Sequence, residues 1–166
     1  VFILAMGWTL FEPRAAQAPA EGKEAPVIIR SFASKEIRAG DVWKVYLKAS
    51  DPEGKMKYIF ATISQPGVGT YPVSIIRIKE ENQNELSGYI SLKTAPVQLS
   101  QFFNLSLTLT VSIRDKGGQF SQPVVFPLSF QPRAAQTGPP EGAFKAQYLG
   151  PIMVTLRTVG GGHRFH

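Results

Sequence analysis

The sequence predicts an all-β fold with two packed sheets, on three observations. Apolar and polar residues alternate along several short segments, which is the pattern of strands with one buried face. Glycine and proline, 15 and 13 of the 166 residues, lie between these segments, where they favour turns. No segment beyond the apolar N-terminal stretch repeats its apolar residues at the helical spacing, so no core helix is expected. Many short strands with frequent turns favour an aligned two-sheet sandwich.

Seven strands are expected in a body that spans residues 27–131. In the clearest, 105–113, five apolar side chains share one face, and segment 43–49 alternates in the same way behind Trp43. The expected strands are 27–32, 43–49, 58–64, 73–79, 86–93, 105–113 and 120–130.

Turn residues separate these strands. Asp51-Pro52-Glu53-Gly54 places proline and glycine where turns prefer them, and Asp115-Lys116-Gly117-Gly118 is expected to close a hairpin. Pro123 and Pro127 interrupt the last strand, which indicates a bulged or edge strand. Residues 95–103 are expected to hold a short helical turn between two strands.

Aromatic residues are interpreted first as core. Those within the expected strands or at their ends are Trp43, Tyr58, Phe60, Tyr89 and Phe120. A carbohydrate-binding role would need exposed aromatics in a row, and the loop aromatics Tyr71, Phe102 and Phe103 form no obvious one.

The N-terminal residues 1–20 are expected to be a signal peptide or a membrane anchor. Residues 1–11 are almost wholly apolar, which is typical of the central region of a secretory signal. Small residues follow, and Ala20 is the favoured cleavage position, with 21–26 as a linker. The chain is therefore expected to be exported, to a bacterial periplasm, cell surface or medium, with membrane contact open to residues 1–11.

The C-terminal part is expected to hold a linker, 132–147, and a tail, 148–166, with one strand at 152–159. The apolar residues Ile152, Val154 and Leu156 are predicted to need burial, against this sandwich or in a neighbour's sheet, and are candidate partner-binding residues.

The charge pattern argues against nucleic-acid binding. The formal net charge is +6, but lysine and arginine are scattered along the chain and no RNA-binding aromatic motif accompanies them. The absence of cysteine excludes disulfides, thiolate catalysis and cysteine-ligated metals. Both histidines lie at the extreme C-terminus, and no nucleophile elbow or phosphate-binding loop occurs, so catalysis is not expected.

A family resemblance supports the sandwich. The string Ala49-Ser50-Asp51-Pro52-Glu53-Gly54, with Tyr58 four residues on, resembles the A-x-D-P-D/E-G turn of cadherin-like and bacterial immunoglobulin-like repeats. Segment 105–113 and the turn after it resemble the F–G hairpin that closes those domains. The resemblance covers about residues 26–131. It implies a seven-stranded immunoglobulin-like Greek-key sandwich, here with an extra C-terminal tail strand.

The resemblance also raises calcium binding, which such families perform through acidic loop residues. By this resemblance Asp51, Glu53 and Asp115 are candidate calcium ligands, and no other cofactor is expected. Calcium takes about six to eight oxygen ligands, the linker motifs of the cadherin sites are absent, and Lys55 and Lys116 adjoin the acids. The alternative is that the aspartates cap their own turns.

Two functions remain open at this point. The first is an exported, non-catalytic module that binds another protein or a copy of itself. The second is a structural or accessory subunit of an envelope assembly, anchored by residues 1–11 or docked by the tail strand.

Overall fold

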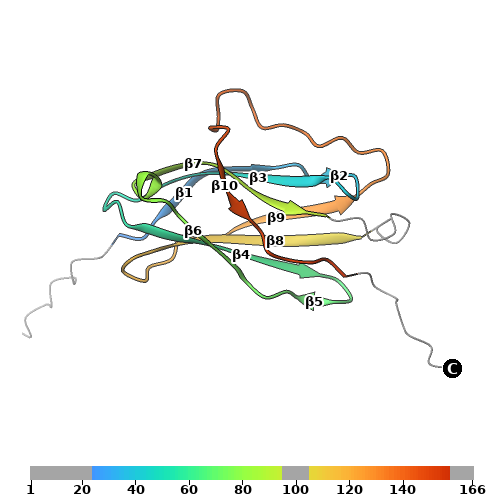
Figure 1. Cartoon of the computed structure of the whole chain (residues 1–166), viewed down its shortest axis with the longest axis horizontal. Coiled ribbons are helices and arrows are strands. Elements are labelled where there is room, and N and C mark those ends of the chain that lie inside the picture. The colour runs from blue at the N-terminus through green and yellow to red at the C-terminus, as the bar shows by residue number, and fades with distance from the viewer. Residues whose placement is uncertain (1–23, 95–104, 158–166) are drawn as a thin grey trace, which may run out of the picture.

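The computed structural model describes residues 24–94 and 105–157, which form two β-sheets packed face to face (Figure 1). The first sheet has the order β1-β3-β7-β10 and the second the order β2-β9-β8-β4-β5, with β6 also paired to β4. The first sheet comprises β1 (Val27–Ala33), β3 (Val42–Ser50), β7 (Glu85–Lys93) and β10 (Tyr148–Pro151). The second comprises β2 (Glu36–Ile37), β4 (Met56–Gln65), β5 (Gly69–Thr70), β6 (Ser74–Arg77), β8 (Ser106–Asp115) and β9 (Val124–Phe130).

The all-β prediction is confirmed, but the strand count differs. The described residues form ten strands and one short 3-10 turn, η1 (Glu80–Asn82), because the chain adds the two-residue strands β2 and β5. Alternation over two residues is too short to be detected in a sequence, so these strands were not expected. The helical turn expected at 95–103 lies outside the described residues. No helix in the described part is long and apolar enough to cross a membrane.

The strand order is that of an immunoglobulin-like sandwich. Strands β1, β3 and β7 lie in one sheet and β9, β8 and β4 in the other, so the chain changes sheet between β3 and β4, between β6 and β7, and between β7 and β8. Of the two prolines expected to mark an edge, Pro123 immediately precedes β9 and Pro127 lies within it, and β2 pairs with only the last two residues of that strand.

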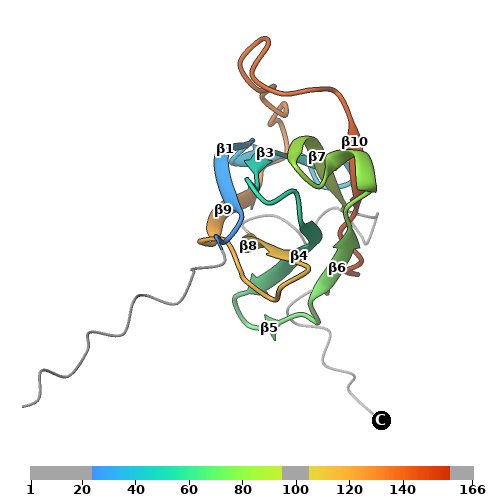
Figure 2. The same ribbon diagram turned by 90° about the vertical axis from the view of Figure 1, so that its left-hand side faces the viewer.

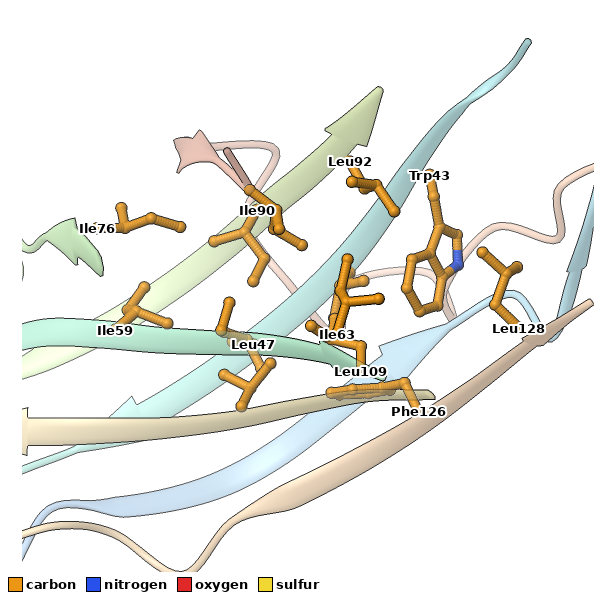
Figure 3. Packing of buried hydrophobic residues seen from close by; sticks show 14 of the residues in the cluster. Trp43, Leu47, Ile59, Ile63, Ile76, Ile90, Leu92, Leu109, Phe126 and Leu128 are labelled. Carbon is orange, nitrogen blue, oxygen red and sulfur yellow. The ribbon is translucent and has the colours of Figure 1, made fainter. Parts of the chain in front are cut away.

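The core lies between the sheets and is built from the inward positions of their strands (Figure 3). In β3, Trp43, Val45 and Leu47 are fully buried, and the facing strand β8 buries Leu109 and Val111. The indole Nε1 of Trp43 donates a buried hydrogen bond of 2.8 Å to the carbonyl of Ser34. The largest core side chain is therefore both packed and satisfied in its polar group.

The tail strand differs in place from the expectation. Strand β10 covers residues 148–151 and not 152–159, and it pairs in parallel with β7, so the fold extends beyond the expected body. Figure 2 shows β10 on the side of the molecule where β7 and β6, from opposite sheets, approach each other. Ile152 and Leu156 then enter the core, where they are 4% and 6% exposed. Burial of each contributes roughly 1.5–3 kcal/mol.

Hydrogen bonds from the tail to both sheets close this side of the sandwich. Ile152 donates its backbone N–H to the carbonyl of Ser91 in β7 at 2.7 Å, and Met153 donates to Ser74 Oγ in β6 at 2.9 Å. Further on, the backbone of Arg157 accepts from the Gln65 side chain and donates to the Tyr71 hydroxyl. The tail therefore bridges the two sheets along this side of the sandwich.

The connection from β9 to β10, residues 132–147, arches over the outer face of the first sheet and is called the strap below (orange in Figures 1 and 2). Gln136 holds one end, because its side-chain amide bonds the backbone of Val42 and Lys44 in β3. At the other end, Tyr89 donates its backbone N–H to the carbonyl of Gln147 at 2.8 Å. The segment expected as a linker is thus tied to the sheet at both ends.

Docking of the tail depends on a glycine. A Cβ at Gly88 would lie 2.4 Å from the carbonyl oxygen of Gln147 and 2.9 Å from Leu149 Cγ. We expect Gly88→Ala to lower the free energy of unfolding by about 1–3 kcal/mol, as overpacking does, measured by urea denaturation. Gly138→Ala is the matched control, since nothing lies within 4 Å of its Cβ position. Equal stability of both variants and the wild-type chain would contradict the proposed role of Gly88.

Candidate functional site

The structure brings the two predicted acidic turns together at one end of the sandwich. The turn after β3 and the turn after β8 are joined by a backbone hydrogen bond of 2.9 Å from Lys116 to Lys55. Asp51 is fully buried, and its two carboxylate oxygens accept the backbone N–H groups of Glu53 and Lys55 at 2.9 and 3.0 Å. Asp51 therefore caps its own turn, as the alternative interpretation expected.

Asp115 and Glu53 have different surroundings. Asp115 is 2% exposed, and its Oδ1 accepts the backbone N–H of Gln119, whereas its Oδ2 accepts no hydrogen bond from the described residues. The Glu53 carboxylate accepts a hydrogen bond from Lys55 Nζ at 2.7 Å. This bond and the charge of Glu53, with smaller contributions from Asp115 and Asp51, raise the pKa of Lys55 above 10.5.

No metal centre is evident in these turns. Residues 24–94 and 105–157 contain no group of three or more histidine, cysteine, aspartate or glutamate side chains arranged to hold a metal ion. Both carboxylate oxygens of Asp51 accept hydrogen bonds from backbone N–H groups, and the Glu53 carboxylate accepts one from Lys55 Nζ. Calcium binding by Asp51, Glu53 and Asp115 stays a prediction.

The predicted partner-binding residues of the tail lie against this chain's own core. Ile152 and Leu156 are buried members of the core cluster, and the half-buried Val154 packs against it. Met153, between them, is 77% exposed. In this arrangement the three apolar residues are used within the chain itself.

A row of four aromatic side chains crosses the outer face of the first sheet. Three register pairs make up the row. Phe32 in β1 is paired with Tyr46 in β3, Tyr46 with Tyr89 in β7, and Tyr89 with Tyr148 in β10. Neighbouring ring centroids are 6.5, 5.5 and 5.6 Å apart, with the planes tilted by 53°, 48° and 45°. We call these four residues the aromatic row. Each strand of the sheet contributes one ring, so the row spans the whole face.

Cations and hydroxyls flank the aromatic row on both sides. On one side, Arg30, Lys48 and Ser87 are consecutive register partners, and on the other Lys44 is the partner of Ser91. The Nζ atom of Lys44 lies 5.1 Å from the centroid of the Tyr89 ring, within cation–π range. The strands of this sheet contain a single acidic residue, Glu85, which lies beyond Ser87.

The strap borders this face and adds a fifth ring. The Phe144 ring lies 5.6 Å from that of Tyr46, and Lys145 donates its backbone N–H to Ser87 Oγ. Beside this contact is a hollow of about 210 Å³ whose lining includes Lys48, Lys145, Phe144 and the acidic Glu85. The outer face of the first sheet is therefore contoured, with an aromatic floor and more basic than acidic side chains around it.

The outer face of the second sheet carries a different surface. Phe60 in β4 is the register partner of Ile75 in β6, and its ring contacts those of Tyr58 and Phe120 at centroid distances of 6.4 and 5.2 Å. Ile75 and Phe120 are 55% and 49% exposed. We call these four residues the apolar patch. Neither the strap nor the described part of the tail, up to residue 157, crosses this face (Figure 2).

The apolar patch is also bordered by cations. Lys57 Nζ lies 5.2 Å from the Tyr58 ring centroid, Arg114 Cζ lies 5.6 Å from that of Phe120, and Arg77 is the register partner of Tyr58. Asp115 is the one acidic residue in strands β4, β5, β6, β8 and β9, and it is buried.

Most aromatics expected in the core lie outside it. Trp43 is a core residue as predicted, but Tyr58, Phe60 and Tyr89 are half-buried on outer faces and Phe120 is exposed. Tyr71, considered as a loop platform, is 8% exposed with its hydroxyl bonded to Gln65, and 102 and 103 lie outside the described residues. Phe32, Tyr46 and Tyr148 were missed. Their alternation with buried residues was the available signal, but their alignment depends on strand pairing.

Comparison with known proteins identifies no family. No family model matches the chain, and no curated protein matches it. Among solved structures, it is similar to the PKD domain of an M14-like peptidase from a Thermoplasmatales archaeon, with a TM-score of 0.40, 11% identity, and coverage of 66% of this chain and 98% of that one. It is also similar to a CARDB domain from Pyrococcus furiosus, solved in complex with di-metal ions, with a TM-score of 0.34, 7% identity, and coverage of 64% and 86%.

The capping role of Asp51 has a measurable consequence. We expect Asp51→Ala to lower the free energy of unfolding by about 1.5–3 kcal/mol, because two hydrogen bonds to a charged group are lost. Glu53→Ala, which removes one exposed ion pair, is the control and should leave stability unchanged within error. Excess calcium should not raise the melting temperature of the wild-type chain. A calcium-dependent rise that Asp51→Ala abolishes would instead establish the calcium site.

Proposed function

We propose that this chain is an exported, non-catalytic interaction module that binds a protein partner through the apolar patch. The observation that carries the proposal is the patch itself, since Ile75 and Phe120 expose about half of their surface beside Phe60 and nothing described covers them. Apolar groups that are held exposed together on one surface, with a polar rim, are typical of interaction surfaces. Export rests on the apolar residues 1–11.

The absence of catalysis in this proposal rests on the residues available. The described residues contain neither histidine nor cysteine, and the buried acids Asp51 and Asp115 are engaged in turns. General acid–base or nucleophilic chemistry needs paired groups beside an open cleft.

The charges around the patch favour a partner of opposite sign. Lys57, Arg77 and Arg114 surround the rings, and the strands of this sheet offer no exposed carboxylate except Glu36 at its far edge. Two copies packed through this face would set like charges against each other, which costs free energy. The partner that fits is therefore a different protein, with apolar side chains and an acidic rim.

Photo-crosslinking in the producing organism tests this proposal. A benzoylphenylalanine at position 75 should form an adduct with one protein, whereas the same group at position 29 should not, although Ile75 and Ile29 are equally exposed at 55% and 58%. Adding Phe120→Glu should lower the adduct yield about tenfold, the effect expected for a contact residue worth roughly 1.4 kcal/mol. Circular dichroism would confirm that the variant is folded.

Three outcomes would contradict it. These are no adduct from position 75, an equal adduct from position 29, or a yield that Phe120→Glu does not change. An adduct between two copies of this chain would instead support the assembly function.

That second candidate function, a subunit of an envelope assembly, is favoured by one observation. The tail that completes the sandwich follows a strap of irregular structure, so the same contacts can form between copies if the tail is exchanged. Exchange of an identical element is a low-cost route to oligomers.

A disulfide reports whether the tail is exchanged. The chain has no cysteine, and Tyr89 and Tyr148 are register partners on neighbouring strands. We expect oxidised Tyr89→Cys/Tyr148→Cys protein to run as a crosslinked monomer on a non-reducing gel, because the tail lies on its own sheet. Disulfide-linked dimers that form at the same concentration would show exchange and favour the assembly function. Tyr148→Cys alone is the control for chance crosslinking.

A further inference from the structure

We infer that the aromatic row is a binding site for an acidic polysaccharide, a polymer of sugars that carry carboxylate groups. This site is separate from the apolar patch, because the two lie on the outer faces of opposite sheets. The inference therefore stands independently of the protein partner proposed above.

The continuity of the row points to an elongated ligand. Four rings in direct register form an unbroken strip across β1, β3, β7 and β10, with no centroid separation above 6.5 Å. Tyr148, at one end, is 51% exposed, and Phe32, at the other, borders a hollow of about 430 Å³ that Ser34 and Thr137 also line. A chain-like ligand lying across the strands would follow the row and pass beside the strap, where Phe144 contacts Tyr46.

The polar groups beside the rings fit a hydroxylated ligand. The hydroxyls of Tyr46, Tyr89 and Tyr148 make no hydrogen bond with any residue in 24–94 or 105–157. An apolar floor with a few unpaired donors and acceptors is the usual composition of a small-molecule or carbohydrate site. Sugar rings present C–H groups on their faces and hydroxyls on their edges, so they match this arrangement.

The charge of the face selects an acidic sugar. Arg30, Lys44 and Lys48 project beside the row, and the one ion pair among the described residues is elsewhere, between Lys55 and Glu53. The cations of this face are therefore free to pair with ligand carboxylates. A neutral polysaccharide has no carboxylates to pair with these cations, whereas an acidic polysaccharide would neutralise their charge.

The geometry of the rings argues against two other ligands, a crystalline polysaccharide surface and a single-stranded nucleic acid. Planes tilted by 45–53° do not form the flat platform that a crystalline polysaccharide surface would require. Single-stranded nucleic acids also bind basic, aromatic surfaces by stacking bases on the rings. Here Tyr46 is in contact with Tyr89, Phe32 and Phe144, so its neighbours leave no space for a base to insert between rings.

The test measures binding of polygalacturonate to the full chain by isothermal titration calorimetry at low salt. Hydroxyethylcellulose is the neutral control, and a thymidine oligonucleotide is the control for charge combined with stacking. We expect binding of polygalacturonate alone. The double variant Arg30→Glu/Lys48→Glu, at two exposed positions, should weaken binding about tenfold because it reverses the charge beside the row. Tyr148→Ala should also weaken it about tenfold, as loss of one stacked ring does in nucleic-acid binding. Arg114→Glu, on the opposite face, is the matched control and should bind like wild type.

Each alternative result would overturn the inference. Absence of polygalacturonate binding, or binding that Arg114→Glu weakens as much as Arg30→Glu/Lys48→Glu, would exclude the aromatic row as the site. Equal binding of hydroxyethylcellulose would exclude the selection of acidic sugars, and equal binding of the oligonucleotide through the same residues would assign the face to nucleic acids. Thermal denaturation of each variant confirms folding. None of these results bears on the crosslink from position 75.

Discussion

The packing of the tail against Gly88 is the contact on which the arrangement of the first sheet depends. Strand β10 reaches β7 only because position 88 has no side chain, and the backbone carbonyl of Gln147 occupies that space. Once docked, the tail inserts Ile152 and Leu156 between the sheets and bonds to Ser91 and Ser74. The same contact fixes the end of the strap. A single small residue in β7 thereby determines how the sandwich is closed and what borders its outer face.

Side chains alternate along each strand between the core and the outer face, so the residues that stabilise the fold differ from those available for binding. Inward positions of β3 and β8 are filled by buried apolar residues and tolerate little change in volume. Outward positions of the same strands face no other sheet, so aromatic residues there are not required by the core. The outer faces nevertheless hold aromatic residues in contact, surrounded by cations with almost no acids. Exposed apolar clusters with a polar border are typical of interaction surfaces.

Periodicity predicted the strands well and the surfaces poorly. Strands β3, β7 and β8 were located within a few residues because their buried side chains alternate over nine or ten positions. The short strands β2 and β5 and the exact place of β10 depend on partners far away in the sequence. The same limit applies to the aromatic row, because Tyr89 was expected in the core, Tyr148 precedes the expected tail strand, and their alignment with Tyr46 depends on strand pairing. Asp51 was predictable as a cap because its bonds reach only two and four residues.

The two surfaces lie back to back, which constrains how they act together. Packed sheets are separated by about 10 Å, so a ligand on the aromatic row and a partner on the apolar patch do not compete for space. No described side chain belongs to both surfaces, and a close-packed core of buried apolar residues lies between them. Binding at the two faces should therefore be energetically independent. A module of this kind would hold the polysaccharide and the protein partner at the same time. It would raise the effective concentration of one near the other, without an allosteric change in either affinity.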